Sequence, residues 1–373
     1  MELKEPNFNS KGSDLSFLED VGIETSKASS AYIITYTPYF KNVTKRELQE
    51  IDNSVKVREN ISHGISLVTS EKQQGEFLNE INSQSPIFLK HMMPVMDAGI
   101  IEKDLDIDKE ILLKRAEGIV EMKPRSKFAV QCRVVGGNLE YSAKDLEVYI
   151  GNSYYNKGHI PTFSDREILN EDIHVISILI HDDKFFMGFS KSTDNLNFHS
   201  DEARISSRAG GREISRAENK LIEALATFNI ELDGEGIALD LGAAPGGWSK
   251  VLADYGYNVL AVDPAELHPK LQDHPKIKHL KIKSQEIKLE EKLDLIVNDM
   301  NMGPQETAKI MNENAHLLKD GGLAIITLKL PNRARNSIKE SVKLLEENYE
   351  VLNIRSLYHN RQEVTALLRK KEK

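Results

Sequence analysis

The chain has 373 residues, of which 40% are hydrophobic, and its formal net charge is −9. This length and apolar content suffice for two or three globular domains and exclude a disordered protein. The longest apolar runs fall far short of the roughly 18 residues that a membrane-spanning helix needs, so no contact with a membrane is predicted.

The single cysteine, Cys132, excludes an internal disulfide and a cysteine-rich zinc finger. This composition suits a reducing cytoplasm, and we predict a cytoplasmic protein without a metal. Residues 1–29 are polar and carry Glu2 and Glu5 where a signal peptide would carry positive charge. We therefore interpret residues 1–29 as a mobile leader.

The acidic excess lies mainly in the N-terminal half of the chain, and the C-terminal part from Arg208 onward is nearly balanced. Overall charge thus gives no support for nucleic-acid binding, although phosphate contacts act locally and do not require a basic protein. A role in RNA binding must be argued from motifs.

Residues 30–97 alternate strand-like and helix-like segments in the order βαββαβ. The predicted strands are Tyr32–Tyr36, Val55–Arg58, Ile65–Thr69 and Ile87–Met92, and the predicted helices are Thr44–Ile51 and Lys72–Ile81. This order favours a ferredoxin-like domain, in which two helices cover one face of an antiparallel sheet. Considered alone, such a domain is most often a structural scaffold.

Residues 98–200 predict a second α+β domain. Its helices are Lys109–Gly118 and Ser142–Asn152, and its strands are Phe128–Val134, Val175–His181 and Lys184–Ser190. Residues 201–216 follow as a linker at the start of the C-terminal domain. The linker holds Arg204, Arg208, Arg212 and Arg216. On a helix this spacing would align four guanidinium groups for phosphate contacts, but Gly210-Gly211 interrupts a helix, and a solvated linker is an equal alternative.

From residue 217 to the end, strands alternate with crossover helices, which predicts a doubly wound, mostly parallel sheet of the Rossmann type. The strands are Ile237–Leu241, Asn258–Val262, Leu293–Asn298, Gly322–Lys329, Glu350–Ser356 and Glu363–Arg369, and the helices are Lys220–Phe228, Trp248–Tyr255, Gln305–Leu318 and Asn336–Asn348. Ligands of such sheets bind at the C-terminal ends of the strands.

A glycine-rich turn between the first of these strands and its helix indicates a nucleoside-cofactor site. The turn and its flanks supply Asp240, Gly242, Ala244, Pro245, Gly246, Gly247 and Trp248. Asp263, at the end of the next strand, is placed to accept hydrogen bonds from ribose hydroxyls. Pro245 lacks an N–H for a pyrophosphate, which disfavours a nicotinamide dinucleotide and suits S-adenosylmethionine better.

The run Asp240-Leu241-Gly242-Ala243-Ala244-Pro245-Gly246-Gly247-Trp248-Ser249 resembles the cofactor motif of the FtsJ-like RNA ribose 2'-O-methyltransferases. Ser215-Arg216-Ala217-Glu218-Asn219-Lys220-Leu221 is similar to that family's element before its first catalytic lysine. The resemblance implies a Lys-Asp-Lys-Glu catalytic tetrad formed by Lys220, Asp299, Lys329 and Glu363, with S-adenosylmethionine as cofactor and Asp299 beside it.

The segment Leu357-Tyr358-His359-Asn360-Arg361-Gln362-Glu363-Val364-Thr365 most resembles the bacterial RlmM branch of that family. This branch implies a cytidine ribose of 23S ribosomal RNA as substrate. It also implies a THUMP RNA-binding domain at residues 98–200, after the ferredoxin-like domain. One departure is the absence of the family's acidic adenine contact after the third strand, where Ser284 or Gln285 could substitute.

Transfer of a methyl group to a 2'-hydroxyl requires that the hydroxyl lose its proton, and no metal is needed because the cofactor carries its own leaving group. We expect Lys329 to be the general base, Asp299 to orient it, and Lys220 and Glu363 to fix the target ribose. An alternative is an RNA-binding or ribosome-assembly factor that retains the fold without turnover. The intact tetrad argues against that alternative.

Overall fold

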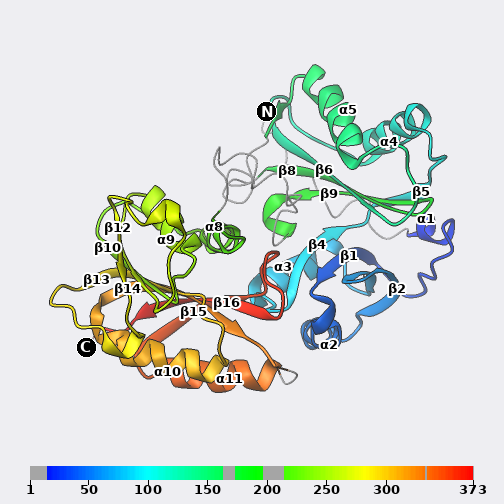
Figure 1. Cartoon of the computed structure of the whole chain (residues 1–373). Helices are drawn as coiled ribbons and strands as arrows, with labels where there is room; N and C mark the ends of the chain where they lie inside the picture. Colours follow the sequence, from blue (N-terminus) through cyan, green and yellow to red (C-terminus); the bar gives the residue numbers. More distant parts are fainter. Residues whose placement is uncertain (1–14, 163–172, 196–213, 332–333, 373) are drawn as a thin grey trace, which may run out of the picture. The chain divides into compact units, whose positions relative to one another are not determined.

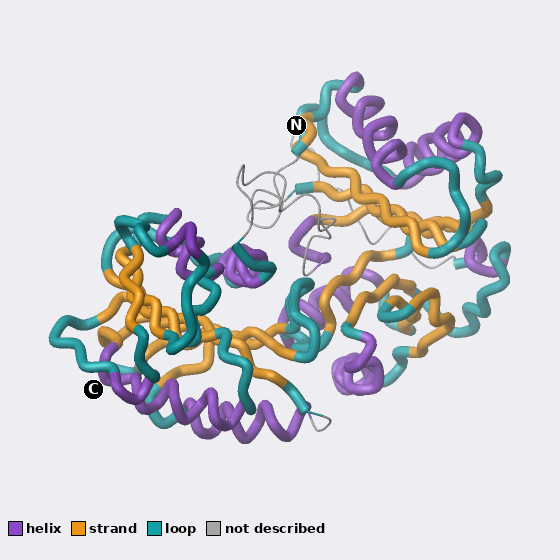
Figure 2. The backbone as a smooth tube through the Cα atoms, viewed as in Figure 1, coloured by secondary structure: helices purple, strands orange, loops and turns teal. Residues whose placement is uncertain are grey.

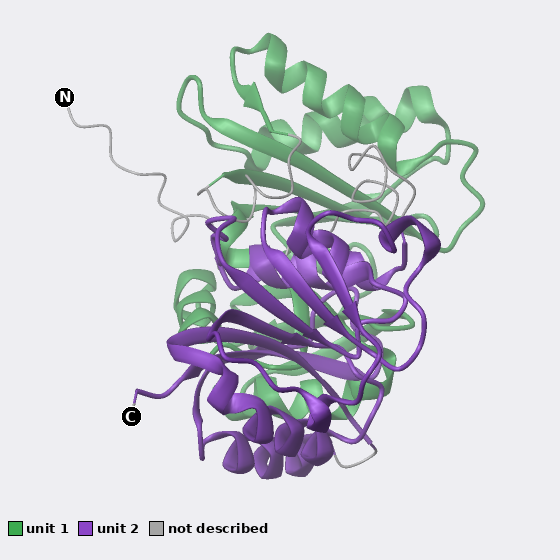
Figure 3. Cartoon of the chain, turned by 60° about the vertical axis from the view of Figure 1, so that its left-hand side comes forward, with its two compact units in different colours: residues 1–199 green, residues 200–373 purple. Residues whose placement is uncertain are grey.

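The computed structural model describes residues 15–162, 173–195, 214–331 and 334–372 of the chain. It divides the chain into two compact units, residues 1–199 and residues 200–373, which Figure 3 shows in different colours. Strands form sheets in both units, and helices cover them (Figure 2). Among the described residues, no helix is long and apolar enough to cross a membrane.

The first sheet of the N-terminal unit has the strand order β2-β3-β1-β4, and all its paired strands are antiparallel. Its elements are β1 (Ser30–Tyr36), α2 (Lys41–Ile51), β2 (Lys56–Ser62), β3 (Ile65–Ser70), α3 (Gln74–Gln84) and β4 (Leu89–Pro94), with the short helix η1 (Pro38–Phe40) before α2. Tyr32, Ile34 and Tyr36 of β1 pack in one core with Leu48 of α2 and Phe77 of α3. The elements follow the predicted βαββαβ order.

The opposite face of β1 is also covered, which corrects the prediction of a mobile leader for residues 15–29. This segment contains the short helix α1 (Ser16–Glu19). Leu15, Leu18, Val21 and Ile23 are buried in a core that includes Ile33 of β1. Because these four apolar residues recur every two or three positions, the segment can bury one side against the sheet. Residues 1–14 lie outside the described residues.

The second sheet has the order β5-β9-β8-β6-β7. Its strands are β5 (Asp97–Ile100), β6 (Lys127–Val135), β7 (Ile160–Pro161), β8 (His174–His181) and β9 (Lys184–Lys191), its helices are α4 (Leu105–Ile119) and α5 (Ala143–Asn156), and the short helix η2 (Ser192–Asn195) follows β9. Both α4 and α5 contribute buried residues to one core with β6, β8 and β9. The assignment of residues 98–200 to a THUMP-like domain stays a prediction.

The C-terminal unit is a mixed α/β structure around a seven-stranded sheet of order β12-β11-β10-β13-β14-β16-β15. The strands are β10 (Ile237–Leu241), β11 (Asn258–Val262), β12 (Ile277–Leu280), β13 (Leu293–Asn298), β14 (Leu318–Lys329), β15 (Tyr349–Arg355) and β16 (Glu363–Lys370). Strands β12, β11, β10, β13 and β14 pair in parallel, whereas β16 pairs antiparallel with both of its neighbours. This confirms the predicted Rossmann-like sheet.

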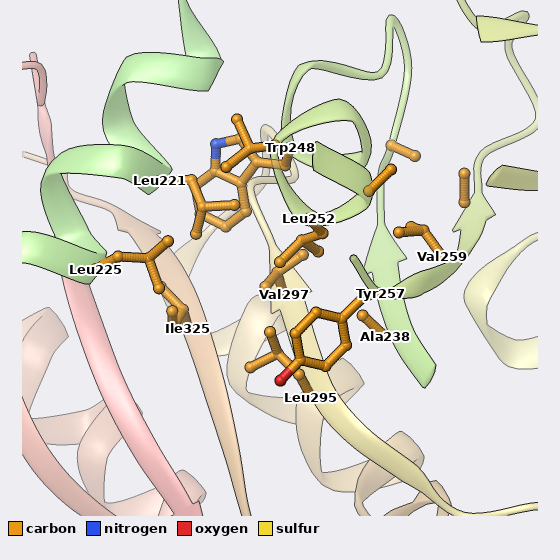
Figure 4. Packing of buried hydrophobic residues seen from close by; sticks show 14 of the residues in the cluster. Leu221, Leu225, Ala238, Trp248, Leu252, Tyr257, Val259, Leu295, Val297 and Ile325 are labelled. Atoms are coloured by element: carbon orange, nitrogen blue, oxygen red, sulfur yellow. The ribbon is translucent and has the colours of Figure 1, made fainter. Parts of the chain in front are cut away.

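Helices lie on both faces of this sheet, with α8 (Ala217–Thr227) and α9 (Gly247–Asp254) on one and α10 (Pro304–Asn314) and α11 (Ala334–Leu345) on the other (Figure 1). Short helices η3 (Pro269–Leu271), η4 (Ser284–Glu286) and η5 (Ala315–Leu317) complete the unit. In Figure 4, Trp248 of α9 packs beside Leu221 of α8. The Trp248 indole N–H also donates to the Ala217 carbonyl at 2.7 Å, which ties α9 to the start of α8.

Candidate active site

Three residues of the predicted tetrad lie close together where the parallel strands of the sheet end, and the sheet topology explains why. Asp299 directly follows β13, and Lys329 is the last residue of the parallel neighbour β14. Glu363 is the first residue of antiparallel β16, and it lies directly opposite Lys329 in the strand register. An antiparallel strand begins where its parallel neighbours end, so the three side chains lie at the same end of the strands. Lys220 reaches them from α8.

The four side chains form a connected network of ion pairs. The Lys220 ammonium lies 2.8 Å from the Glu363 carboxylate and 3.2 Å from that of Asp299. The Lys329 ammonium lies 3.0 Å from Asp299 and 3.8 Å from the Glu363 oxygen that Lys220 contacts. Thr327, two residues before Lys329 on the same side of β14, donates its hydroxyl to Asp299 at 2.7 Å. Asp299 is therefore a shared acceptor at the centre of the network.

The environment distinguishes the two lysines. Burial opposes the positive charge of Lys220, but the carboxylates of Asp299 and Glu363 outweigh burial and raise the pKa of Lys220 above its usual value. Lys220 thus stays protonated at neutral pH. Lys329 lies 3.8 Å from the Glu363 oxygen that Lys220 contacts, and it lies 3.0 Å from Asp299. Asp299 is therefore its nearest anionic partner. Of the two, Lys329 is the one less tightly held by carboxylates.

The network borders an open pocket of about 1200 Å³ in the C-terminal unit. Lys220, Lys329 and Glu363 line it, together with segments 301–305 and 358–362. Two exposed arginines, Arg216 and Arg361, are also part of the lining. Of the four predicted linker arginines, Arg216 is therefore at the pocket, whereas Arg204, Arg208 and Arg212 lie outside the described residues. The pocket has room and positive charge for a nucleotide with its phosphate.

The glycine-rich turn passes from β10 into α9 with backbone geometry that side chains would disturb. Gly246 is the N-cap of α9 with φ of 110°, and a Cβ there would collide with Leu271. Gly242 has φ of 74°, and a Cβ there would collide with Met300. The Ala244–Pro245 peptide bond is cis. Glycine is thus required at both positions by conformation and by space.

Asp263 has the geometry expected of a ribose ligand. One carboxylate oxygen accepts the Ala244 N–H at 3.1 Å and the other accepts the Ala265 N–H at 2.8 Å, so the carboxylate is fixed beside the glycine-rich turn. Each oxygen retains a further lone pair for a hydroxyl. Ser284 lies after β12 in η4, and its hydroxyl donates to the Gln285 side chain at 3.3 Å. These residues fit a nucleoside cofactor.

Replacing Asp263 with Ala should weaken S-adenosylmethionine binding by about 1 to 3 kcal/mol, because two hydroxyl acceptors are lost. Isothermal titration calorimetry with the cofactor and its demethylated product measures this difference. Asp273→Ala, at an exposed aspartate ten residues further on, is the matched control and should bind as the wild type does. Equal affinity of Asp263→Ala and the wild type would remove Asp263 from the cofactor site.

Asp240 is buried inside β10, and its carboxylate accepts the Ser249 hydroxyl at 2.7 Å. Burial raises the pKa of Asp240 to about 7, whereas an aspartate in the unfolded chain titrates near 3.9. Between these values the folded state holds the proton and the unfolded state does not. The contribution of Asp240 to stability is therefore present at acidic pH and is lost as pH rises through about 7.

Asp240→Asn should remove this pH dependence, since the amide keeps an acceptor for Ser249 and carries no charge. We expect the variant to gain on the order of 1 to 4 kcal/mol over the wild type at pH 8, and little at pH 4. Thermal unfolding of the cofactor-free protein across this pH range measures the difference. A difference of equal size at both pH values would contradict this account of Asp240.

Several site residues carried no separate signal in the sequence. Thr327 could have been found from the two-residue period of β14, which places it on the same side as Lys329. Glu223, one turn after Lys220 on α8, bonds to the loop around His359, a contact across 136 positions that no local pattern indicates. Among the residues that the structure describes, no cluster of three or more His, Cys, Asp or Glu is arranged to hold a metal ion.

Part of the chain is similar in sequence to a known family of proteins. Residues 214–347 match the family of FtsJ-like methyltransferases. The chain is 32% identical over 200 residues to ribosomal RNA large subunit methyltransferase M of Psychromonas ingrahamii, an alignment that covers 49% of this chain and about half (53%) of that relative.

Two other similar proteins align over most of their length. The chain is 26% identical over 357 residues to an uncharacterized protein of Methanocaldococcus jannaschii, covering 91% of this chain and 98% of that one. Among solved structures, TrmN from Thermus thermophilus aligns with 91% of this chain and 99% of its own, at 13% identity and a TM-score of 0.36.

Proposed function

We propose, from the premise that residues 214–347 are an FtsJ-like methyltransferase domain, that this protein is an S-adenosylmethionine-dependent RNA ribose 2'-O-methyltransferase. The observation that carries the proposal is the network of Lys220, Asp299, Lys329 and Glu363. It lies at the same edge of the sheet as the glycine-rich turn and borders a pocket with two exposed arginines.

The bound cofactor would supply an activated methyl group with its own leaving group. The residues of this chain would position the ribose and accept the hydroxyl proton. Lys220 is the weaker candidate for the base, because the carboxylates of Asp299 and Glu363 raise its pKa despite its burial. Lys329 is therefore the base that we propose, with Asp299 orienting it and receiving the Thr327 hydrogen bond. Lys220 and Glu363 would hold the ribose.

The proposed substrate is ribosomal RNA, with a cytidine of 23S RNA as the specific target. Similarity of the C-terminal half to ribosomal RNA large subunit methyltransferase M supports this choice. We further propose that residues 98–200 act as a THUMP-like RNA-binding domain, that the linker arginines contact phosphates, and that the protein works in the cytoplasm. Neither a metal nor a membrane is part of this proposal.

Mapping 2'-O-methyl groups in ribosomal RNA with and without the gene tests the function directly. We expect one methylated ribose to be lost in the deletion strain and restored by purified protein with S-adenosylmethionine. An unchanged methylation map, together with RNA binding by the purified protein, would favour the alternative of an assembly factor without turnover. Tight binding of NAD in place of S-adenosylmethionine would favour a dehydrogenase.

A further inference from the structure

The loop Leu357–Gln362, which joins β15 to β16, is held in place by hydrogen bonds of its own. The Asn360 side-chain oxygen accepts the Leu357 N–H at 2.8 Å and the Thr365 hydroxyl at 3.2 Å. The Gln362 carbonyl accepts the Leu330 N–H at 2.7 Å, so the loop is also bonded to the residue after Lys329. The loop therefore presents its side chains to the pocket from a fixed backbone.

Glu223 of α8 anchors this loop through one buried carboxylate, whose side chain is 8% exposed. It accepts the backbone N–H of Tyr358 at 2.5 Å, the backbone N–H of His359 at 2.9 Å, and the His359 ring nitrogen Nδ1 at 2.8 Å. A carboxylate accepts hydrogen bonds and cannot donate them, so Nδ1 must carry its proton. In the neutral ring, the other nitrogen, Nε2, is then an acceptor.

Nε2 of His359 is the unusual atom of this arrangement. It is buried, and among the residues that the structure describes it has no hydrogen-bond partner. The His359 side chain is 9% exposed and belongs to the lining of the pocket that Lys220, Lys329 and Glu363 border. Buried polar atoms in folded proteins almost always have a partner, so an unpartnered nitrogen on a residue that lines a pocket points to a ligand.

We propose that His359 is a substrate-recognition residue whose Nε2 accepts a hydrogen bond from the bound nucleotide, and that Glu223 is the residue that positions it. The inference rests on the proposed function and deepens it. The donor on the RNA is a base amino group or a ribose hydroxyl, since both carry the required hydrogen. A base amino donor would make the contact selective among nucleotides, whereas a ribose hydroxyl is common to all of them.

Two substitutions distinguish the role of the Nδ1 nitrogen from that of the Nε2 nitrogen. His359→Asn keeps a donor for Glu223 through its amide nitrogen but has no atom at the Nε2 position. His359→Gln places an acceptor oxygen near the Nε2 position and gives up the bond to Glu223. With ribosomal RNA from a strain lacking the gene, we expect His359→Asn to raise the KM for RNA at least tenfold with kcat changed less than threefold. His359→Gln should recover a large part of the affinity.

A cofactor titration and a thermal melt of each variant verify that the fold and the S-adenosylmethionine site are intact. Wild-type KM for RNA in His359→Asn would overturn the proposal, as would equal losses in both variants. If the wild type itself fails to methylate RNA, the proposed function fails. The same variants then test His359 by RNA binding alone, where His359→Asn should still bind at least tenfold more weakly than the wild type.

Nuclear magnetic resonance of protein labelled with ¹⁵N-histidine provides an independent readout. The His359 ring, assigned by its absence in His359→Asn, should carry its proton on Nδ1, and the Nε2 signal should shift when RNA binds. A proton on Nε2 in the free protein would overturn the proposal. Oligonucleotides lacking either the target base's amino group or its 2'-hydroxyl identify the donor. Loss of the true donor should weaken wild-type binding and leave His359→Asn binding unchanged.

Discussion

Replacing Lys329 with Ala should lower the rate of RNA methylation by about two to four orders of magnitude, because the proposed acceptor of the hydroxyl proton is lost. Lys329→Arg should be nearly as damaging. A guanidinium can keep the ion pair with Asp299, which in the wild type is 3.0 Å long, but it holds its proton at any working pH. Methyl incorporation into ribosomal RNA from a strain lacking the gene, measured at several pH values, gives these rates.

The pH dependence adds a second criterion. The wild-type rate should climb with pH, as expected for a reaction that needs an essential base, and the Lys329→Arg variant should not follow that rise. Lys319→Arg is a suitable control because Lys319 lies on the same strand near its other end, where it pairs with Asp294 and is half exposed. Near wild-type turnover in Lys329→Arg would show that Lys329 only positions the substrate.

The sequence was sufficient to predict most of the C-terminal sheet because most of its parallel strands contain a short, nearly continuous apolar run. Strand β10, for example, is Ile-Ala-Leu-Asp-Leu and is buried on both faces. The short strand β12 has Lys278 and His279 at its centre, and the apolar pattern alone did not identify it. It lies at the sheet edge, where charged residues block pairing with another chain, so its polarity reflects its position.

The four residues of the tetrad were predicted by resemblance, and the structure explains why they meet. Strand order places the end of β13 beside the end of β14, and the antiparallel direction of β16 brings Glu363 opposite Lys329. Neither fact is present in local sequence patterns. The same limit applies to Glu223 and His359, which are 136 positions apart and meet only after α8 has packed against the sheet.

The prediction of a mobile leader was wrong for residues 15–29, and the physical reason is a different one. Its polar composition predicted a leader, yet four apolar residues within 15–29 suffice to bury it against β1. Average polarity over 29 residues conceals a short apolar face, because burial depends on where the apolar residues lie and not on their mean.

Asp299→Asn tests whether the network needs the carboxylate charge at its centre, and we expect a loss of activity of about two to three orders of magnitude. Asp299 accepts hydrogen bonds from Lys220, Lys329 and Thr327, so its charge stabilises two cations at once. An amide has one acceptor oxygen and would direct its NH2 group toward a donor. Lys220 would then retain Glu363 as its close anionic partner.

The two lysines should respond differently to this change. Lys220, which Glu363 contacts at 2.8 Å, should stay in place, whereas Lys329 loses its nearest carboxylate and should move away from the position required for proton transfer. The defect should therefore lie in kcat more than in the KM for RNA. Single-turnover methylation separates these parameters.

Asp294→Asn is the matched control, since Asp294 lies in β13 near the end opposite to Asp299 and accepts the Ile237 N–H at 2.8 Å. That bond survives with an amide, and activity should change less than threefold. If Asp299→Asn also retained wild-type kcat, the charge at the centre of the network would be dispensable. The proton would then have to leave by a route that does not depend on an oriented Lys329.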